Sequence, residues 1–187
     1  MAEHVCPWWM GYLLASPIRR WRQPPEELLA AYVREGMTVL EPGPGMGFFT
    51  VPLSRMVGVS GRVVAVDIQQ RMLESLRRRA VKAGTSERIE TRLTRPASLG
   101  IGDLEGRVDL VLAFAVVHEL PSAQTFFSEA CAAMKPEATL LFAEPAGHVK
   151  PEKFEAELNA AREAGLEVDS RLTIRGSLAA ALKKRQR

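Results

Sequence analysis

The chain has 187 residues, of which 47% are hydrophobic and 25% charged, which is the composition of a globular protein and excludes a disordered or fibrous one. Its formal net charge of +3 does not by itself indicate a nucleic-acid partner. The longest apolar runs, such as residues 110–117, are too short to span a membrane, and Cys6 and Cys131 are too few for a disulfide framework. With no secretory signal pattern, these features predict a cytoplasmic protein.

The first 24 residues differ in composition from the rest of the chain. They contain all three tryptophans, among them Trp8 and Trp9, together with Tyr12. We expect residues 1–24 to form an aromatic arm or lid and residues 25–187 to form a single domain. His4 and Cys6 are too few to hold a structural zinc ion, so no metal site is predicted.

Hydrophobic periodicity predicts alternating helices and strands along the rest of the chain. The run 108–114 is continuously apolar, which is typical of a strand buried on both faces of a parallel sheet. Strands alternating with helices of this length indicate an α/β fold with helices on both faces of the sheet. The expected helices are 24–34, 47–57, 69–83, 122–135 and 151–164; the expected strands are 37–41, 62–67, 88–93, 108–114, 138–144 and 166–174; residues 177–184 fit a helix or an edge strand.

The loop after the first strand follows Glu41 and Pro42 and carries glycines at alternate positions, Gly43, Gly45 and Gly47. Such spacing lets the backbone turn sharply and approach a ligand closely. A phosphate-binding loop would need a Gly-Lys-Ser/Thr sequence, and the dinucleotide fingerprint would need glycine in place of Phe48. The loop therefore indicates a nucleoside ligand without a pyrophosphate, or a ligand-free turn.

Asp67 ends the second strand, and a carboxylate there can accept hydrogen bonds from both hydroxyls of a ribose. Ligands of such sheets bind outside the carboxyl ends of the strands. Asp67 together with the glycine loop predicts a ribose-containing ligand; capping of the next helix is the alternative.

Four segments together resemble the class I S-adenosylmethionine-dependent methyltransferases, and more narrowly their small-molecule, type 11 branch. The segments are VLEPGPGMGFFT (39–50), VVAVDIQQRML (63–73), VDLVLAFAVVHELP (108–121) and MKPEATLLFAEP (134–145). The resemblance covers about residues 28–175. It implies a three-layer Rossmann-like sheet of seven strands, mostly parallel with an antiparallel last strand, which would make residues 177–184 a strand.

The resemblance also implies roles for individual residues in binding S-adenosylmethionine, whose product is S-adenosylhomocysteine. Glycines 43, 45 and 47 would pass under the methionine part of the cofactor, and Glu41, with Pro42 beside it, would hold the loop and reach the amino group. Asp67 would hold the ribose and Ile68 would lie against adenine. Ala113 and Phe114 would border the sulfonium.

One departure from the family pattern concerns adenine. Relatives often carry an acid after the third strand, whereas this chain has Thr94-Arg95-Pro96-Ala97-Ser98. Backbone groups or Ser98 are the replacements that the sequence offers.

The implied reaction is in-line displacement of the sulfonium methyl by a small-molecule acceptor. His118 follows the fourth strand directly and is the candidate base, since an imidazole titrates near neutral pH; a structural histidine bonded to a loop carbonyl is the alternative. Glu144 and His148 are candidate substrate residues, as are Trp8, Trp9 and Tyr12, because aromatic faces attract cations. Too few cysteines are present for an arsenite methylator.

Several other functions remain open from the sequence. An RNA or protein methyltransferase is one alternative, although no Asn/Asp-Pro-Pro-Tyr/Phe motif follows the fourth strand and the arginine clusters fit solvated helix faces. A non-catalytic cofactor-binding module is another, and a nicotinamide dehydrogenase is disfavoured by Phe48. No membrane span is expected, and the protein is expected to be a monomer or homodimer.

Overall fold

The computed structural model describes residues 24–185, so Trp8, Trp9, Tyr12 and nearly all of the expected arm lie outside the described residues. The described chain consists of two compact units, residues 24–94 and residues 95–185. None of the helices described for this part of the chain is long and apolar enough to cross a membrane.

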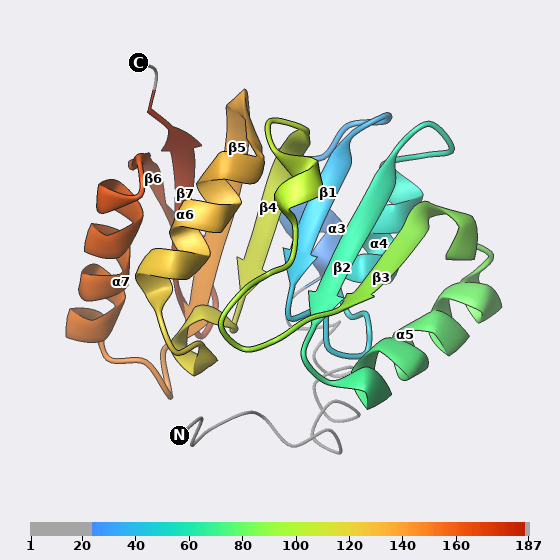
Figure 1. The fold of residues 1–187 in the computed structure, drawn as a ribbon, viewed down its shortest axis with the longest axis horizontal. Coiled ribbons are helices and arrows are strands. Elements are labelled where there is room, and N and C mark those ends of the chain that lie inside the picture. Colours follow the sequence, from blue (N-terminus) through green and yellow to red (C-terminus); the bar gives the residue numbers. More distant parts are fainter. Residues whose placement is uncertain (1–23, 186–187) are drawn as a thin grey trace. The chain divides into compact units, whose positions relative to one another are not determined.

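The first unit is built around three parallel strands in the order β3-β2-β1 (Figure 1). Its register pairs Pro42 of β1 with Val66 of β2, and Asp67 of β2 with Leu93 of β3. All three strands therefore finish at the same edge. The elements are α3 (Pro25–Leu29), β1 (Thr38–Pro42), α4 (Thr50–Met56), β2 (Arg62–Asp67), α5 (Gln70–Ala83), the 3-10 turn η1 (Ser86–Arg88) and β3 (Ile89–Leu93).

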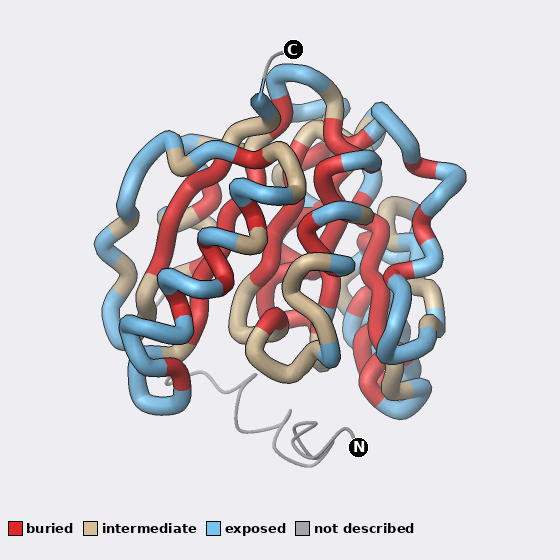
Figure 2. Tube along the Cα trace, turned by 60° about the vertical axis from the view of Figure 1, so that its left-hand side comes forward, coloured by how far each residue is buried: buried red, intermediate tan, exposed pale blue. Residues whose placement is uncertain are grey.

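The apolar stripe of α5 covers β2. Leu73 and Leu76 are fully buried against Ala65 of β2 and Val51 of α4. The helix ends at Gly84, which adopts φ +68° and whose amide donates to Val81, as a left-handed C-cap requires. Figure 2 shows that the strands are buried and that the helices are exposed on their outer sides.

The second unit contains four strands in the order β4-β5-β7-β6. β4 and β5 are parallel, whereas β7 runs antiparallel to both β5 and β6. The elements are the 3-10 turn η2 (Gly102–Leu104), β4 (Val108–Phe114), the 3-10 turn η3 (Val117–Glu119), α6 (Ala123–Ala133), β5 (Met134–Pro145), α7 (Pro151–Glu163), β6 (Leu166–Ile174) and β7 (Ser177–Lys184).

Phe142 of β5 is the centre of the second core. Its ring packs edge-on against Phe127 of α6, with centroids 5.4 Å apart, and stacks on Phe154 of α7 at 4.9 Å. Across the sheet, Phe142 pairs with the small Ala180 of β7. Cys131 of α6 is buried, as its place on an apolar helix face predicts.

The expected α/β fold is confirmed, with seven strands that are parallel except for the last one in the chain. Residues 177–184 form a strand, as the family resemblance implies.

Three expected helices are too long: the one expected over 47–57 begins only at Thr50, and the first and the fourth end early. The strand expected over 138–144 is too short, because β5 begins at Met134. The first helix ends at Leu29 and continues as a turn, in which Arg34 Nη1 donates to the carbonyls of Ala30 and Ala31. The helix expected to reach residue 135 ends at Ala133, since Pro136 forces the residue before it out of the helical region.

Candidate functional site

Glu41 lies near the end of β1 and is only 3% exposed. Its strand partner is Ala65, two residues before Asp67. Because side chains alternate between the faces of a strand, Glu41 and Asp67 lie on the same face of the sheet. Two acidic side chains therefore lie on one face of the sheet, near the edge where β1 and β2 end.

The Glu41 carboxyl group is held in an unusual state. Burial raises its pKa to about 8; the neighbouring Thr50 hydroxyl acts against this rise, and the nearby Asp67 charge adds to it. Glu41 Oε2 and Thr50 Oγ1 are both buried without a hydrogen-bond partner among residues 24–185. An unpartnered buried oxygen of this kind is a natural acceptor for a donor group of a ligand.

The glycine loop follows immediately, and its three glycines adopt positive φ values: 65° at Gly43, 54° at Gly45 and 85° at Gly47. Their environments differ. Among residues 24–185, a Cβ on Gly45 would meet nothing within 4 Å, whereas one on Gly47 would lie 2.5 Å from Leu76 Cδ1. Gly45 therefore faces open space, and Gly47 allows the loop to pack on α5.

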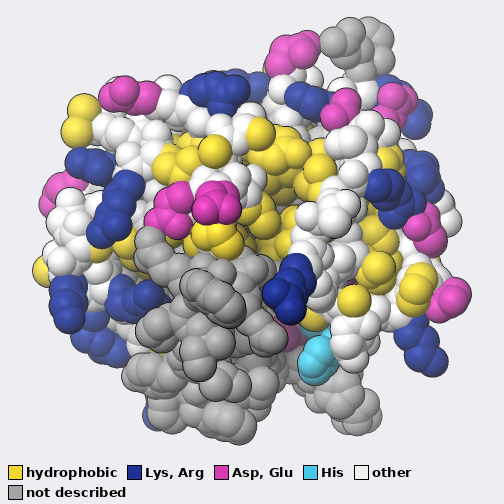
Figure 3. Space-filling view, turned by 180° about the vertical axis from the view of Figure 1, so that it is seen from behind, with side chains coloured by type: hydrophobic (Ala, Val, Ile, Leu, Met, Phe, Trp, Pro, Cys, Tyr) yellow, Lys and Arg dark blue, Asp and Glu magenta, His cyan; other side chains and the backbone are white. Residues whose placement is uncertain are grey.

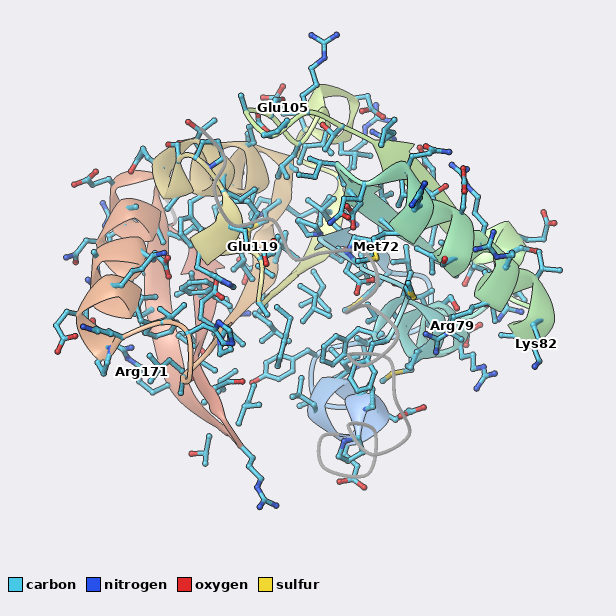
Figure 4. All side chains as sticks on the ribbon, turned by 90° about the horizontal axis from the view of Figure 1, so that it is seen from below. Met72, Arg79, Lys82, Glu105, Glu119 and Arg171 are labelled. Atoms are coloured by element: carbon cyan, nitrogen blue, oxygen red, sulfur yellow. The ribbon has the colours of Figure 1, made fainter. Side chains whose placement is uncertain are left out.

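Two contacts fix this loop to its surroundings. The amide of Gly43 donates to the Val66 carbonyl at 2.9 Å, and Arg79 Nη1 of α5 donates to the Met46 carbonyl at 3.0 Å (Figure 4). Sequence analysis missed Arg79, whose contact spans 33 residues and leaves no local signal.

Asp67 is 8% exposed, and its Oδ1 accepts a 2.8 Å hydrogen bond from the Gln69 amide. That bond orients the carboxylate at the edge of the sheet, beside the half-buried Ile68. Ser98, the candidate adenine partner, is exposed, and its hydroxyl accepts from the Gly100 amide at 3.1 Å.

In the second unit, Ala113 is fully buried at the end of β4 and Phe114 is half-buried. Ala115 comes next with φ 58°, and within residues 24–185 no other non-glycine residue has a positive φ. Its amide donates to the Ala143 carbonyl of β5 at 2.7 Å. A strained backbone of this sort is common beside functional sites.

His118, in η3, is bound twice by Glu144 of β5. The His118 amide donates to Glu144 Oε1 at 3.1 Å, and His118 Nδ1 lies 2.5 Å from Glu144 Oε2. The Glu144 side chain is 0% exposed. Its hydrogen bond raises the pKa of His118 above the usual value, with burial acting in the opposite direction. His148 is exposed in the turn after β5.

Two residues of α7 complete this second cluster and were missed by sequence analysis. Glu157 is 5% exposed, its Oε2 has no hydrogen-bond partner among residues 24–185, and burial raises its pKa to about 7. Lys153 Nζ lies 3.9 Å from Glu157 Oε1 and donates to the His118 carbonyl at 3.2 Å. A signal existed, because Glu157 falls within the apolar stripe of Phe154, Leu158 and Ala161.

Over residues 24–185, no three His, Cys, Asp or Glu side chains are grouped as metal ligands would be. A family model described as a methyltransferase domain matches residues 33–177, which is most of the chain. The chain belongs to the methyltransferase family.

Relatives of this methyltransferase support the assignment. A crystal structure of an S-adenosylmethionine-dependent methyltransferase from Aquifex aeolicus aligns with a TM-score of 0.81 and 26% identity, covering 95% of this chain and 99% of that one. An arsenite methyltransferase of Halobacterium salinarum is 30% identical over 106 residues, which is 57% of this chain and 26% of that protein. The match thus spans about a quarter of the length of this curated relative.

A third relative, a putative rRNA-methylase from Clostridium thermocellum, shares the fold, with a TM-score of 0.68 and 18% identity over 85% of this chain and 94% of that one. The resemblance to class I S-adenosylmethionine-dependent methyltransferases is therefore confirmed, and S-adenosylmethionine is the cofactor that this membership implies.

The methyltransferase residues of the first unit fit this cofactor. It carries a cationic amino group and a ribose diol, which are donors, and the unit presents a buried, unpartnered Glu41 oxygen and an oriented Asp67 carboxylate. The open space over Gly45 is compatible with close approach of a ligand to the backbone.

Proposed function

We propose that this methyltransferase transfers the methyl group of S-adenosylmethionine to a small-molecule acceptor. The cofactor supplies an electrophilic methyl group, and the chain supplies binding, orientation and proton removal. The observation that favours a small acceptor over a nucleic acid is that most Lys and Arg side chains of residues 24–185 are held by contacts within the chain.

Most of the basic residues among residues 24–185 form hydrogen bonds or ion pairs within the chain. Arg77 donates to Thr91 Oγ1 at 2.6 Å, and Arg78 donates to Ser75 Oγ at 2.9 Å. Near the C-terminus, Lys184 donates to the Met134 carbonyl at 2.9 Å, and Arg185 donates to Glu167 at 2.7 Å. On the face drawn in Figure 3, Lys and Arg side chains gather at the lower left, and over the rest of that face Asp and Glu side chains lie among them. A nucleic-acid surface would instead cluster cations that are available to phosphates.

For the cofactor, we assign the amino group to Glu41, the methionine backbone to Pro42 and glycines 43, 45 and 47, and the ribose to Asp67. Ile68 would cover one face of adenine, while Ala113 and Phe114 would border the sulfonium. The Asp67 carboxylate needs no reorientation when the cofactor binds, because the Gln69 amide already holds it.

For the acceptor, we assign His118 as the group that takes up a proton, held by Glu144. Positioning alone supplies much of the rate of an in-line displacement, about 7–11 kcal/mol for well-aligned reactants. Trp8, Trp9 and Tyr12 would wall an apolar acceptor, and His148 would lie at its edge.

Calorimetric titration with S-adenosylmethionine and S-adenosylhomocysteine, with reduced nicotinamide dinucleotide as the control, tests the cofactor assignment. We expect micromolar binding of the first two and none of the third. Transfer of radiolabelled methyl to phenols, quinones and thiols then tests the acceptor class. Methylation of ribosomal RNA with no transfer to any small molecule would refute the small-molecule proposal.

A further inference from the structure

Thr50, the first residue of α4, carries a hydroxyl group that its own helix does not use. The residue is 0% exposed, and its Oγ1 has no hydrogen-bond partner among residues 24–185. A buried threonine hydroxyl in a helix typically bonds a carbonyl three or four residues earlier. Here the Met46 carbonyl accepts from Arg79 Nη1, and the Gly47 carbonyl accepts from the Val51 amide. The Thr50 hydroxyl is therefore left for a partner outside its helix.

Ser54, one turn further along α4, shows the ordinary arrangement. It is equally buried, at 0% exposure, and its Oγ donates to the Val51 carbonyl at 2.8 Å. A buried hydroxyl without a hydrogen bond is costly to the fold. The unused hydroxyl of Thr50 thus indicates a role that Ser54 does not have.

The neighbour that fits this hydroxyl is the Glu41 carboxyl group of β1. Glu41 is 3% exposed, and its Oε2 is the other unpartnered buried oxygen at this edge of the first unit, within the described residues. The Thr50 hydroxyl lowers the pKa of Glu41, as a hydrogen-bond donor to the ionised carboxylate does. A Cβ on Gly47 would lie 3.7 Å from Thr50 Cβ, so Thr50 lies beside the loop that follows Glu41.

The other groups around this carboxyl group oppose its ionisation. Burial removes it from water, and Asp67 of β2 adds a negative charge. The loop of residues 42–49 carries no titratable side chain, and Arg79 of α5 donates to the Met46 carbonyl of its backbone. Among the groups of residues 24–185 that act on Glu41, Thr50 is the one that favours the charged form.

We propose that Thr50 is the positioning residue of the site for the cofactor's amino group, where its hydroxyl holds the Glu41 carboxyl group in both charge states. The inference rests on the proposed function, in which Glu41 binds that amino group. Before the cofactor binds, the neutral carboxyl group donates a hydrogen bond to Thr50 Oγ1. When the ammonium group binds, Glu41 loses its proton to water and the Thr50 hydroxyl donates to the carboxylate. A hydroxyl group can take both parts because it is a donor and an acceptor.

Three variants of the 187-residue chain test the inference: Thr50→Val, Thr50→Ser and, as a matched control, Thr85→Val. Valine removes the hydroxyl at nearly constant size, and serine keeps it. Thr85 is also buried in the first unit, at 3% exposure, and its Oγ1 also lacks a partner within the described residues. Thermal unfolding checks the fold of each variant, and Thr50→Ala replaces Thr50→Val if that protein does not fold.

Calorimetry with S-adenosylhomocysteine at two pH values is the first measurement. At pH 7, Thr50→Val should bind about tenfold more weakly than the parent, because ionisation of Glu41 becomes more costly without the hydroxyl. At pH 9 the difference should narrow to about twofold, since the carboxyl group is then largely ionised in both proteins. Thr50→Ser and Thr85→Val should match the parent at both pH values.

Two further readouts separate this role from one in packing alone. Adenosine carries the ribose and the base without the amino group, so Thr50→Val should bind it as the parent does. In the free protein, NMR of carbon-13-labelled glutamate should show that Glu41 titrates at a higher pH in Thr50→Val than in the parent and in Thr50→Ser. A loss of packing would instead weaken both ligands equally and at both pH values.

Failure of this inference and failure of the proposed function give different results. If the parent binds S-adenosylhomocysteine and Thr50→Val binds it equally well at pH 7, Thr50 does not position Glu41. An equal loss at pH 7 and pH 9, an equal loss for adenosine, or the same shift in Thr85→Val also overturns the inference. In each of these cases the methyltransferase proposal survives. If the parent binds neither cofactor form, the proposed function itself fails.

Discussion

Glu41 and Asp67 lie on the same face at the ends of two paired parallel strands, and the charge of Asp67 helps to raise the pKa of Glu41. Neighbouring carboxyl groups that share a site do not ionise equally. With a pKa of about 8, Glu41 is mostly protonated at neutral pH. A cationic ligand would reverse the state of Glu41.

Binding of S-adenosylhomocysteine should release a proton from Glu41. With a pKa of about 8, the carboxyl group is mostly protonated at pH 7, and a bound amino group would favour its ionised form. Calorimetry at pH 7 in buffers of different ionisation enthalpy should detect release of about one proton per cofactor. Affinity should rise with pH up to about 8. In Glu41→Gln the proton release should disappear; if it persists, another group is its source.

Asp67→Asn should weaken binding of S-adenosylhomocysteine about 10- to 100-fold, the usual effect of losing a hydrogen bond to a charged group. The asparagine oxygen can still accept from the Gln69 amide, so the loop should keep its shape. Calorimetry measures the affinity, and thermal unfolding checks the fold. The exposed Glu87→Gln in the same unit is the control. An unchanged affinity would remove Asp67 from the site.

Gly45→Ala should mainly weaken cofactor binding, whereas Gly47→Ala should mainly lower the stability of the fold. Both place a methyl group at a positive φ, which costs about 1–2 kcal/mol. Only the Gly47 methyl meets the core, 2.5 Å from Leu76 Cδ1, so Gly47→Ala should be the less stable protein in urea unfolding. Gly45→Ala should lose more cofactor affinity, because its methyl group enters open space beside the loop. The reverse ranking would contradict the proposal that the cofactor passes close to the loop at Gly45.

Glu157→Gln should make stability less dependent on pH. The folded-state pKa of Glu157 is raised from 4.5 to about 7, so the native state holds this proton more tightly than the unfolded chain. Stability therefore falls as pH rises from 4.5 to 7, by up to about 1.4 kcal/mol per pH unit. At pH 8 the variant should gain about 1–3 kcal/mol over the parent, and little at pH 4.5. Urea unfolding at pH 4.5 and pH 8 measures the gain in stability, with Glu152→Gln as the control. An equal gain at the two pH values would show that Glu157 does not titrate between them.

The sequence predicts the strands well because each is a short apolar run bounded by turn residues, and β2 and β4 have the predicted bounds. The Glu41 and Asp67 positions were found for the same reason, since both are acids that end such runs. The His118–Glu144 bond joins residues 26 apart and depends on the parallel register of β4 and β5, which no local pattern encodes. α3 ends at Leu29 although the helical spacing of apolar residues continues to Val33.

Ala115 has a consequence for changing the acceptor by protein engineering. Its left-handed backbone reverses the chain three residues before His118, and its amide is bonded to Ala143, one residue before Glu144. The number of residues between Ala115 and His118 thus places the imidazole where the Glu144 carboxylate can hold it. An insertion between Ala115 and His118 would move the imidazole away from the Glu144 carboxylate. Exchange of side chains elsewhere around the acceptor would leave this spacing unchanged. To change the acceptor specificity of this protein, residues should be substituted while the length of the segment from Ala115 to His118 is kept.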